Sequence, residues 1–263
     1  MTGAANRLDI ALVERGIAES RSKAQALVLA GSVLVDGQVV TRSGHRVAGS
    51  QDIALRRKPR FVSRGGEKLD HAIVAFQIDV EGRTCADIGA STGGFTDCLL
   101  QASASRVYAI DVGYGQLDYR LRVDPRVVIM ERVNARYLSG LPEPVSLAAI
   151  DVSFISLKLI LPVAYKLLTD PGACVALVKP QFEAGREQVG RKGVVSDVAV
   201  HRGVLLQVFE HARDEHFTIA GLARSPLKGP AGNIEFLLHL SKGDVESPVL
   251  KPESLIDRVL EGS

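Results

Sequence analysis

The sequence predicts an α/β protein with a parallel sheet at its centre, preceded by a small α+β domain. From about residue 66 onward, strand-like apolar runs alternate with helix-like runs, which is typical of repeated βαβ units. Before that point the pattern is two short helical segments and a hairpin. Residues 1–64 contain eleven Lys/Arg and five Asp/Glu, a net charge of +6, which leaves −4 for the rest of a chain whose total is +2. We expect domains over 1–56 and 64–263, joined by a linker over 57–63.

Turn residues mark the elements of the small domain. Apolar residues at helical spacing predict a first helix that ends at Gly16. Ser20 is placed to cap a second helix, which Gly31 ends. The pair Asp36-Gly37, between the apolar runs "SVLV" and "QVV", predicts a hairpin turn.

Basic residues gather in this first part of the chain. Arg7, Arg21 and Lys23 are placed to form a positive face on the two helices, and the basic stretch 56–60 extends it. A basic module joined to a mildly acidic domain indicates a polyanionic partner. Charge alone equally fits a solvated basic surface.

In the large domain, apolar periodicity assigns the elements in order. Strands are predicted over 84–89, 106–113, 127–131, 146–153, 172–180, 217–223 and 233–240, and helices over 68–76, 93–101, 156–168 and 200–215. Strands that alternate with helices in this way predict a doubly wound sheet. In such a sheet, ligands bind beyond the carboxyl ends of the strands.

Several function classes are disfavoured by composition. No apolar run reaches the roughly 18 to 20 residues of a membrane helix, and the charged first twenty residues do not resemble a secretion signal. The three cysteines are scattered without CxxC spacing, which argues against a disulfide scaffold and against a zinc site. We expect a cytoplasmic protein without a metal. The sequence does not predict the oligomeric state.

The stretch "DIGASTGGFTDCLL" (87–100) predicts a nucleotide-binding turn between a strand and a helix. Its glycines would let a ligand approach the backbone and the helix N-terminus, and Asp111 follows the next strand, where an acid can bind ribose hydroxyls. Because the spacing is not G-x-G-x-x-G, it suits an adenosyl ligand without pyrophosphate better than NAD. The residues we expect to hold it are Asp87, Gly89, Ser91, Gly93, Gly94, Asp111 and Asn134. The alternative for Asp87 is an acid that only caps the next helix.

Four charged residues are placed near the same edge of the sheet. Asp151 and Lys179 end two apolar strands, Lys68 lies at the start of a helix, and Glu235 lies in the last predicted strand, on the face that it shares with Leu237. Taken singly, each has a structural explanation: an exposed helix lysine, an edge-strand charge, and one ion pair between Asp151 and Lys179. Together they make a candidate catalytic group.

Two resemblances join these observations. "RLDIALVERGIAESRSKAQALVLAGSVLVDGQ" resembles the RNA-binding module named after the S-four ribosomal protein. The resemblance implies that the second helix and the turn before it bind structured RNA, and we expect Arg7, Arg21, Lys23 and Arg64 to contact it.

The large domain resembles ribose methyltransferases of the FtsJ/RrmJ type, and more closely the TlyA family. The resemblance rests on the ordered series "SRGGEKL", "DIGASTGGFTDCLL", "DVGYGQL", "ERVNAR", "DVSFISL", "LVKPQFE", "GVVSD" and "SPLKGPAGNIEFLL". It implies a Rossmann-like fold, S-adenosylmethionine as cofactor, and methylation of the 2′ oxygen of ribosomal RNA ribose, at cytidines. Where that family usually has a tryptophan in the linker, this chain has Phe61 before Val62.

The resemblance also assigns a Lys-Asp-Lys-Glu tetrad. We expect Lys179 to act as general base, Lys68 to tune and position it, and Asp151 and Glu235 to orient the amines. A lysine amine has an ordinary pKa of about 10.4 and works as a base only where that value falls to about 7 to 8, which burial and a neighbouring cation both favour.

Three other functions compete with this one. A methyltransferase of similar fold could act on a small molecule or a protein, but it would leave the basic first domain unexplained. Members of the TlyA family are often labelled haemolysins, yet the sequence shows neither a membrane segment nor a long amphipathic insertion hairpin. A non-enzymatic RNA-binding factor with a vestigial tetrad is disfavoured because all four positions hold the expected residue types.

Overall fold

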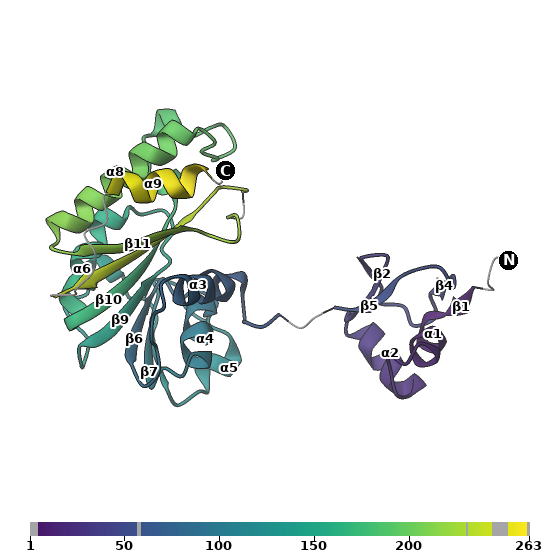
Figure 1. Ribbon diagram of the computed structural model, residues 1–263. Coiled ribbons are helices and arrows are strands. Elements are labelled where there is room, and N and C mark those ends of the chain that lie inside the picture. Colours follow the sequence, from purple (N-terminus) through teal and green to yellow (C-terminus); the bar gives the residue numbers. More distant parts are fainter. Residues whose placement is uncertain (1–4, 57–58, 230, 244–251, 262–263) are drawn as a thin grey trace. The chain divides into compact units, whose positions relative to one another are not determined.

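The computed structural model describes residues 5–56, 59–229, 231–243 and 252–261, and it divides into two compact units, Met1–Pro59 and Arg60–Ser263 (Figure 1). Each unit has hydrophobic clusters of its own. Within the predicted linker, Arg57 and Lys58 lie outside the described residues.

The N-terminal unit packs two helices against two small antiparallel sheets. Its described elements are β1 (Asn6–Arg7), α1 (Leu8–Glu14), α2 (Arg21–Leu29), β2 (Val33–Val35), β3 (Gln38–Val39), β4 (Arg46–Val47) and β5 (Ile53–Leu55). Strand β1 pairs with β4, and the other sheet has the order β3-β2-β5. Leu8, Leu12 and Val28 are fully buried between helices and strands.

The turn chemistry of this unit confirms the sequence prediction. The Ser20 side chain accepts a hydrogen bond from the Lys23 backbone at the start of α2. Gly16 and Gly31 follow the two helices with φ of +69° and +65°, a conformation that favours glycine. Asp36 and Gly37 both have positive φ and join β2 to β3 as a two-residue hairpin turn.

The second unit is built on a seven-stranded sheet with the order β11-β12-β10-β9-β6-β7-β8. Its strands are β6 (Thr84–Ile88), β7 (Arg106–Ile110), β8 (Val127–Met130), β9 (Val145–Ile150), β10 (Leu168–Val178), β11 (Thr218–Arg224) and β12 (Phe236–Lys242). The five strands from β10 to β8 are parallel, while β12 runs antiparallel to both β10 and β11. The predicted α/β class with a parallel core is confirmed.

Helices cover both faces of this sheet (Figure 1). They are α3 (Arg64–Ala75), α4 (Gly94–Gln101), α5 (Tyr119–Arg122), α6 (Leu161–Leu167), α7 (Pro180–Glu183), α8 (Val198–Asp214) and α9 (Pro252–Glu261), with 3-10 turns η1 (Ala135–Tyr137), η2 (Leu157–Leu159) and η3 (Arg186–Gln188). Alternate residues of one strand serve different faces: Leu147 and Ala149 of β9 join the cluster that contains α3 and α4, and Ala148 and Ile150 join the cluster that contains α6 and α8.

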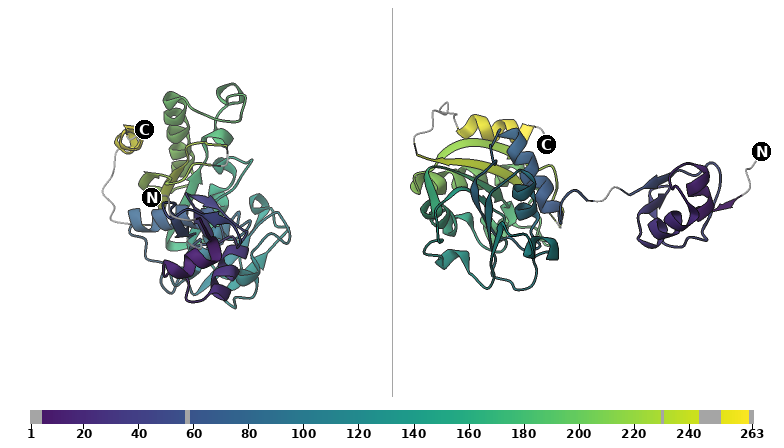
Figure 2. Two further views of the ribbon diagram at one scale, coloured as in Figure 1. Left: turned by 90° about the vertical axis from the view of Figure 1, so that its right-hand side faces the viewer. Right: turned by 90° about the horizontal axis from the view of Figure 1, so that it is seen from below.

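Some elements differ from the prediction. The expected helix over 156–168 is divided into η2 and α6, and Pro162 lies in the first turn of α6, where its missing N–H costs no intrahelical bond. Strand β10 begins at Leu168, earlier than the sequence indicates. Helix α9, yellow in Figure 2, is absent from the prediction; it packs against α8 and β11 and buries Leu255, Ile256 and Leu260.

Part of the segment that the sequence assigns to the linker packs within the second unit. The Phe61 side chain is 4% exposed and lies against Gly66, where any β-carbon would collide with its ring. The Val62 backbone N–H donates to Asp97, and the Gln101 side chain donates to the Arg60 carbonyl. Residues 60–63 therefore fix the start of α3, and with it the position of Lys68.

Candidate active site

The carboxyl ends of the parallel strands bring the four tetrad residues together. Asp151 follows β9, Lys179 follows the adjacent strand β10, and Lys68 lies in the first turns of α3. Glu235 precedes β12, whose first residue, Phe236, pairs with Val178 immediately before Lys179. Because β12 is antiparallel to β10, its start lies at the edge where β10 ends.

The four side chains form two ion pairs. Lys68 Nζ lies 2.5 Å from Glu235 Oε2, and Lys179 Nζ lies 2.6 Å from Asp151 Oδ1. The second contact is an ion pair without the alignment of a hydrogen bond; Lys179 Nζ instead donates to Ser153 Oγ at 2.9 Å. Each lysine thus has a carboxylate that orients it.

Burial makes these pairs unusual. Lys68 and Lys179 are each 8% exposed and Glu235 is 1% exposed, whereas lysines rarely leave the surface unless paired. Spacing along α3 indicates an exposed Lys68; the structure buries it because Glu235 comes from the neighbouring strand, a contact between residues 167 positions apart.

Two adjoining cavities open at this edge. The first, of about 270 Å³, contains the tetrad lysines and is lined by Ser63, Arg64, Gly65, Lys68, Gly89, Ala90, Ser91, Thr92, Gly94, Phe95, Asp151, Ser153 and Lys179. The second, of about 450 Å³, has apolar walls that include Ile110, Val133, Ile155 and Ile160, and its polar lining residues are Ser91, Asp111, Gln116, Asn134, Asp151 and Ser153. Both cavities share Gly89, Ser91, Asp151 and Ser153, so they meet at the end of β6.

The glycines of the turn after β6 are required by the protein's own packing. Gly89 has φ of +93°, and a β-carbon there would lie 2.5 Å from the Asp151 carbonyl oxygen. A β-carbon at Gly93 would collide with Leu121, and one at Gly94 would collide with the Ser63 hydroxyl. The space at Gly93 and Gly94 is thus occupied by protein, which differs from the sequence argument that these glycines leave room for a ligand.

Asp87 is fully buried and lines neither cavity. Its Oδ2 accepts hydrogen bonds from the Thr96 backbone (2.8 Å) and hydroxyl (2.6 Å), as a cap of α4, while Oδ1 has no partner among the described residues. Burial raises the pKa of Asp87 to about 7, and the charges of Asp151 and Asp111 act in the same direction. The Asp87 carboxylate therefore lies in a field that favours a cation nearby.

Asp111 and Asn134 line the second cavity, as does Ser91. Asp111 Oδ2 accepts from the Ser91 backbone (2.8 Å) and Oδ1 from the Gly113 backbone (2.6 Å), so the carboxylate is held in place and each oxygen keeps a further lone pair. Ser91 has φ of +47°. The Asn134 side chain accepts from the Arg136 backbone at the start of η1.

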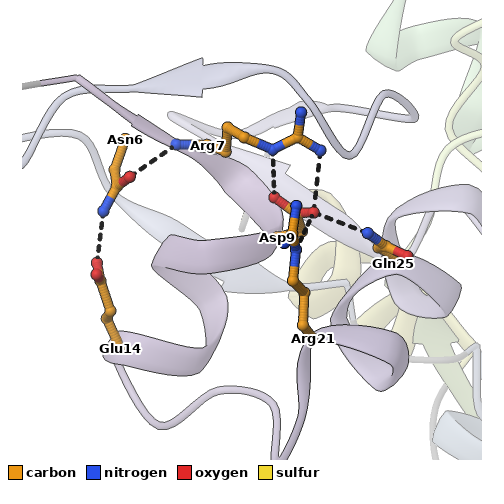
Figure 3. Close-up of polar contacts among 6 residues, drawn as sticks. All are labelled: Asn6, Arg7, Asp9, Glu14, Arg21 and Gln25. Atoms are coloured by element: carbon orange, nitrogen blue, oxygen red, sulfur yellow. Dashed lines mark hydrogen bonds and ion pairs between the residues drawn. The ribbon is translucent and has the colours of Figure 1, made fainter.

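The four residues predicted to contact RNA fall in different surroundings. Arg64 is the first residue of α3 and lines the first cavity. In the N-terminal unit, Lys23 pairs with Glu19 at the surface, and Arg7 and Arg21 both bind the carboxylate of Asp9 (Figure 3). The sequence did not indicate a role for Asp9.

Comparisons with known proteins agree with this geometry. A family model described as "FtsJ-like methyltransferase" matches residues 61–242, and a model described as "S4 domain" matches residues 6–53. The chain belongs to the FtsJ-like methyltransferase family. Since the matched part carries the sheet, both cavities and all four tetrad residues, the second unit is the methyltransferase domain, and the first unit contains the S4 domain.

Relatives of this methyltransferase carry two kinds of name. The "16S/23S rRNA (cytidine-2'-O)-methyltransferase TlyA" of Mycobacterium tuberculosis is 45% identical over 240 residues, covering 89% of each chain. The "Hemolysin A" of Brachyspira hyodysenteriae is 44% identical over 236 residues, covering 89% of this chain and 98% of the relative. A solved structure, "Putative hemolysin from Streptococcus thermophilus", has 43% identity and a TM-score of 0.73 and covers 98% of this chain and 96% of that chain.

The residues around both cavities fit S-adenosylmethionine. Its sulfonium and amino groups are cationic, and the carboxylates of Asp111 and Asp151 line the second cavity. Its adenine is apolar on both faces, which suits the second cavity, whose walls include Ile110, Val133 and Ile155. In the part of the chain that the structure describes, no three metal-binding side chains cluster.

The sequence did not predict two further residues whose hydrogen bonds hold parts of this site in place. Ser153 holds Lys179, and its position two residues after Asp151 in "DVSFISL" was the available signal. Glu183 accepts hydrogen bonds from the Ser156 hydroxyl (2.6 Å) and the Leu157 backbone (2.8 Å), and so ties the loop after β9 to the segment after Lys179. No periodicity in the sequence marks Glu183, because its partners lie 26 and 27 residues away.

Proposed function

We propose that this protein methylates the 2′ oxygen of ribose, at a cytidine of ribosomal RNA, with S-adenosylmethionine as methyl donor. The observation that carries the proposal is the position of Lys179: its amine lines the first cavity, within ion-pair distance of Asp151, at the wall shared with the second cavity. The S4 domain and the relatives named as rRNA (cytidine-2'-O)-methyltransferases support RNA as the substrate. A ribosomal RNA substrate places the reaction in the cytoplasm.

The chain's own residues have distinct tasks in this reaction. S-adenosylmethionine, when bound, supplies a methyl group that is already a good electrophile. A ribose hydroxyl is a weak nucleophile, so the protein must align it and take its proton. Lys179 Nζ, in its neutral form, accepts that proton, and Asp151 and Ser153 hold the amine at the cavity wall.

Lys68 and Glu235 complete the arrangement from the other side. The Glu235 carboxylate, 1% exposed, orients Lys68, whose cationic amine lines the same cavity as Lys179. A fixed positive charge beside the 2′ oxygen stabilises the negative charge that develops there as the proton leaves. In this proposal Gly89, Ser91, Asp111 and Asn134 contact the methyl donor, while Asp87, Gly93 and Gly94 fix the turn that surrounds it.

The test is to map 2′-O-methylated positions in ribosomal RNA from cells that lack this protein, from cells that carry it, and from cells that carry Lys179→Ala. We expect the modified cytidine to appear only with the unaltered chain. Purified Lys179→Ala should still bind S-adenosylmethionine within a few-fold of wild type, since the second cavity is unchanged. Methylation by Lys179→Ala at the wild-type rate would refute the assignment of the base.

The names of the relatives suggest a second candidate, a pore-forming haemolysin. Among the described residues, no helix is both long and apolar enough to cross a lipid bilayer. Lysis of protein-free liposomes by the purified chain would support that candidate. Methyl incorporation into a small molecule or a protein, with none into ribosomal RNA, would instead favour a methyltransferase of another substrate class.

A further inference from the structure

Asp9 lies at the centre of a charge cluster in the N-terminal unit (Figure 3). Its carboxylate is fully buried and accepts two hydrogen bonds from Arg7 (Nε, 3.0 Å; Nη2, 3.1 Å), one from Arg21 Nε (3.0 Å) and one from Gln25 (2.9 Å). Oδ2 accepts three of these hydrogen bonds and Oδ1 accepts one, so both oxygens of the buried carboxylate have donors. Hydrogen bonds from Arg7, and then from Gln25 and Arg21, hold the pKa of Asp9 well below its usual range, so this carboxylate is ionised at neutral pH.

The two arginines differ from their anchor in exposure. The side chains of Arg7 and Arg21 are 44% and 57% exposed, while that of Asp9 is 0% exposed. Among the hydrogen bonds of the described residues, none uses Arg7 Nη1 or either Nη of Arg21. Arg7 is therefore held on Asp9 by two N–H groups and Arg21 by one, and both guanidinium groups have N–H donors left for a ligand.

Arg7 is also restricted on its second side. Its guanidinium lies close to Gly44, where an added β-carbon would be 3.2 Å from Nη1. The backbone of Leu8 and of Asp9 itself donates to the carbonyls of His45 and Ser43 in the same loop. The orientation of Arg7 is thus set by the Asp9 carboxylate and by the loop of residues 43–45, which backbone hydrogen bonds hold in place.

We propose that Asp9 is a positioning residue for RNA binding, whose buried carboxylate fixes Arg7 and Arg21 so that their remaining donors meet phosphate oxygens. The inference rests on the proposed RNA substrate. Fixing two long side chains before binding reduces the rotamer entropy that binding would otherwise cost. A guanidinium held at one edge also presents its fork-like donor geometry to a phosphate.

For the Asp9→Asn variant, this proposal and a simple charge argument predict opposite changes in RNA affinity. Asp9→Asn removes a negative charge from an RNA-binding surface, and Coulomb's law alone then predicts tighter RNA binding. If Asp9 acts by positioning, binding must weaken instead. Glu19→Gln is the matched control, because Glu19 is an exposed acid of the same domain whose partner, Lys23, is also a predicted phosphate contact.

The experiment uses the full chain and unmodified large-subunit ribosomal RNA transcribed in vitro, with dissociation constants measured by filter binding between 50 and 200 mM KCl. We expect Asp9→Asn to weaken binding about tenfold and to lower the salt slope by about 1 to 2, because each lost phosphate contact contributes about 0.9. Glu19→Gln should bind as tightly as wild type or tighter, with the same slope. Binding by Asp9→Asn that equals or exceeds wild type would overturn the proposal.

A further measurement and a further variant separate positioning from folding. In Asp9→Asn protein, the hydrogen-exchange protection of the α2 amides should equal that of wild type while RNA affinity falls, whereas a folding defect would lower both. If Asp9→Asn does not fold, as judged by hydrogen exchange of α2 amides, Arg21→Lys decides: it keeps the charge but loses the Nε anchor, and we expect it to weaken binding about fivefold. Wild-type affinity in Arg21→Lys would then refute the inference. Absence of RNA binding by wild type itself would refute the proposed function.

Discussion

Asp9 in the N-terminal unit and Asp87 in the methyltransferase domain are both fully buried, yet their surroundings are opposite. Asp9 accepts four hydrogen bonds, three of them from two cationic side chains, and its pKa lies well below the usual range. Asp87 has donors on one oxygen only, and burial raises its pKa to about 7. Burial alone therefore does not determine what a carboxylate does; the donors that accompany it do.

The comparison extends to the cations. Asp9 orients arginines that are about half exposed and can reach a large polyanion. Asp151 and Glu235 orient lysines that are 8% exposed and can reach only what enters the cavity. The same kind of ion pair thus lies at the surface in one unit and beside a cavity in the other.

The largest effect is expected where both partners are buried. Lys68→Met leaves Glu235 as an uncompensated charge, which costs about 3 to 5 kcal/mol of unfolding free energy. Tyrosine fluorescence during urea unfolding can measure this, because all five tyrosines lie in the methyltransferase domain and the chain has no tryptophan. Lys68→Met/Glu235→Gln should regain most of the stability but not the activity. If the unfolding free energy of Lys68→Met lies within 1 kcal/mol of the wild-type value, this buried ion pair contributes no more to stability than an exposed one.

The pH dependence of the unfolding free energy tests whether burial raises the pKa of Asp87. Its pKa is 3.8 in the unfolded chain and about 7 in the folded one, so the folded state binds more protons between these values. The stability that Asp87 contributes is then highest at low pH and falls as pH rises toward 7, by about 2.5 kcal/mol between pH 4.5 and 6.5. Without methyl donor, the difference in unfolding free energy between wild type and Asp87→Asn should show this slope. A flat difference would instead place the Asp87 carboxylate in a better solvated site.

The sequence predicted the features that depend on local pattern. Strand-like apolar runs that alternate with helix-like runs predicted the parallel strands, and Gly16, Gly31 and Asp36-Gly37 predicted the turns, because local sequence pattern decides both. The grouping of Lys68 with Glu235 came from the family resemblance, since nothing local links residues 167 positions apart. Asp9 and Glu183 were missed for the same reason: the donors that give each its role come from other elements.

An intermediate effect, on S-adenosylmethionine affinity, is expected for Glu183, a carboxylate that is hydrogen-bonded but forms no ion pair among the described residues. Its carboxylate holds the loop whose residues Val152–Ile155 line the second cavity. Glu183→Ala should weaken S-adenosylmethionine binding about tenfold, equivalent to about 1.4 kcal/mol, as measured by titration calorimetry. Glu183→Gln keeps an acceptor for the Leu157 N–H and should restore most of the affinity. Equal affinities for the two variants would show that the hydrogen bonds do not hold the loop.

The smallest effect is expected for an ion pair exposed on both sides. Arg60 Nη1 lies 2.6 Å from Asp70 Oδ2, with side chains 61% and 31% exposed. Water can replace either partner, and such pairs contribute about 0.2 to 1 kcal/mol. Asp70→Asn should therefore lower the unfolding free energy of the methyltransferase domain by less than about 1 kcal/mol, and the difference should vanish at 1 M KCl, where the Debye length is about 3 Å. A loss as large as that of Lys68→Met, or one that persists in salt, would mean that exposure is the wrong variable and that the fixing of Arg60 over the Phe61 ring carries the stability.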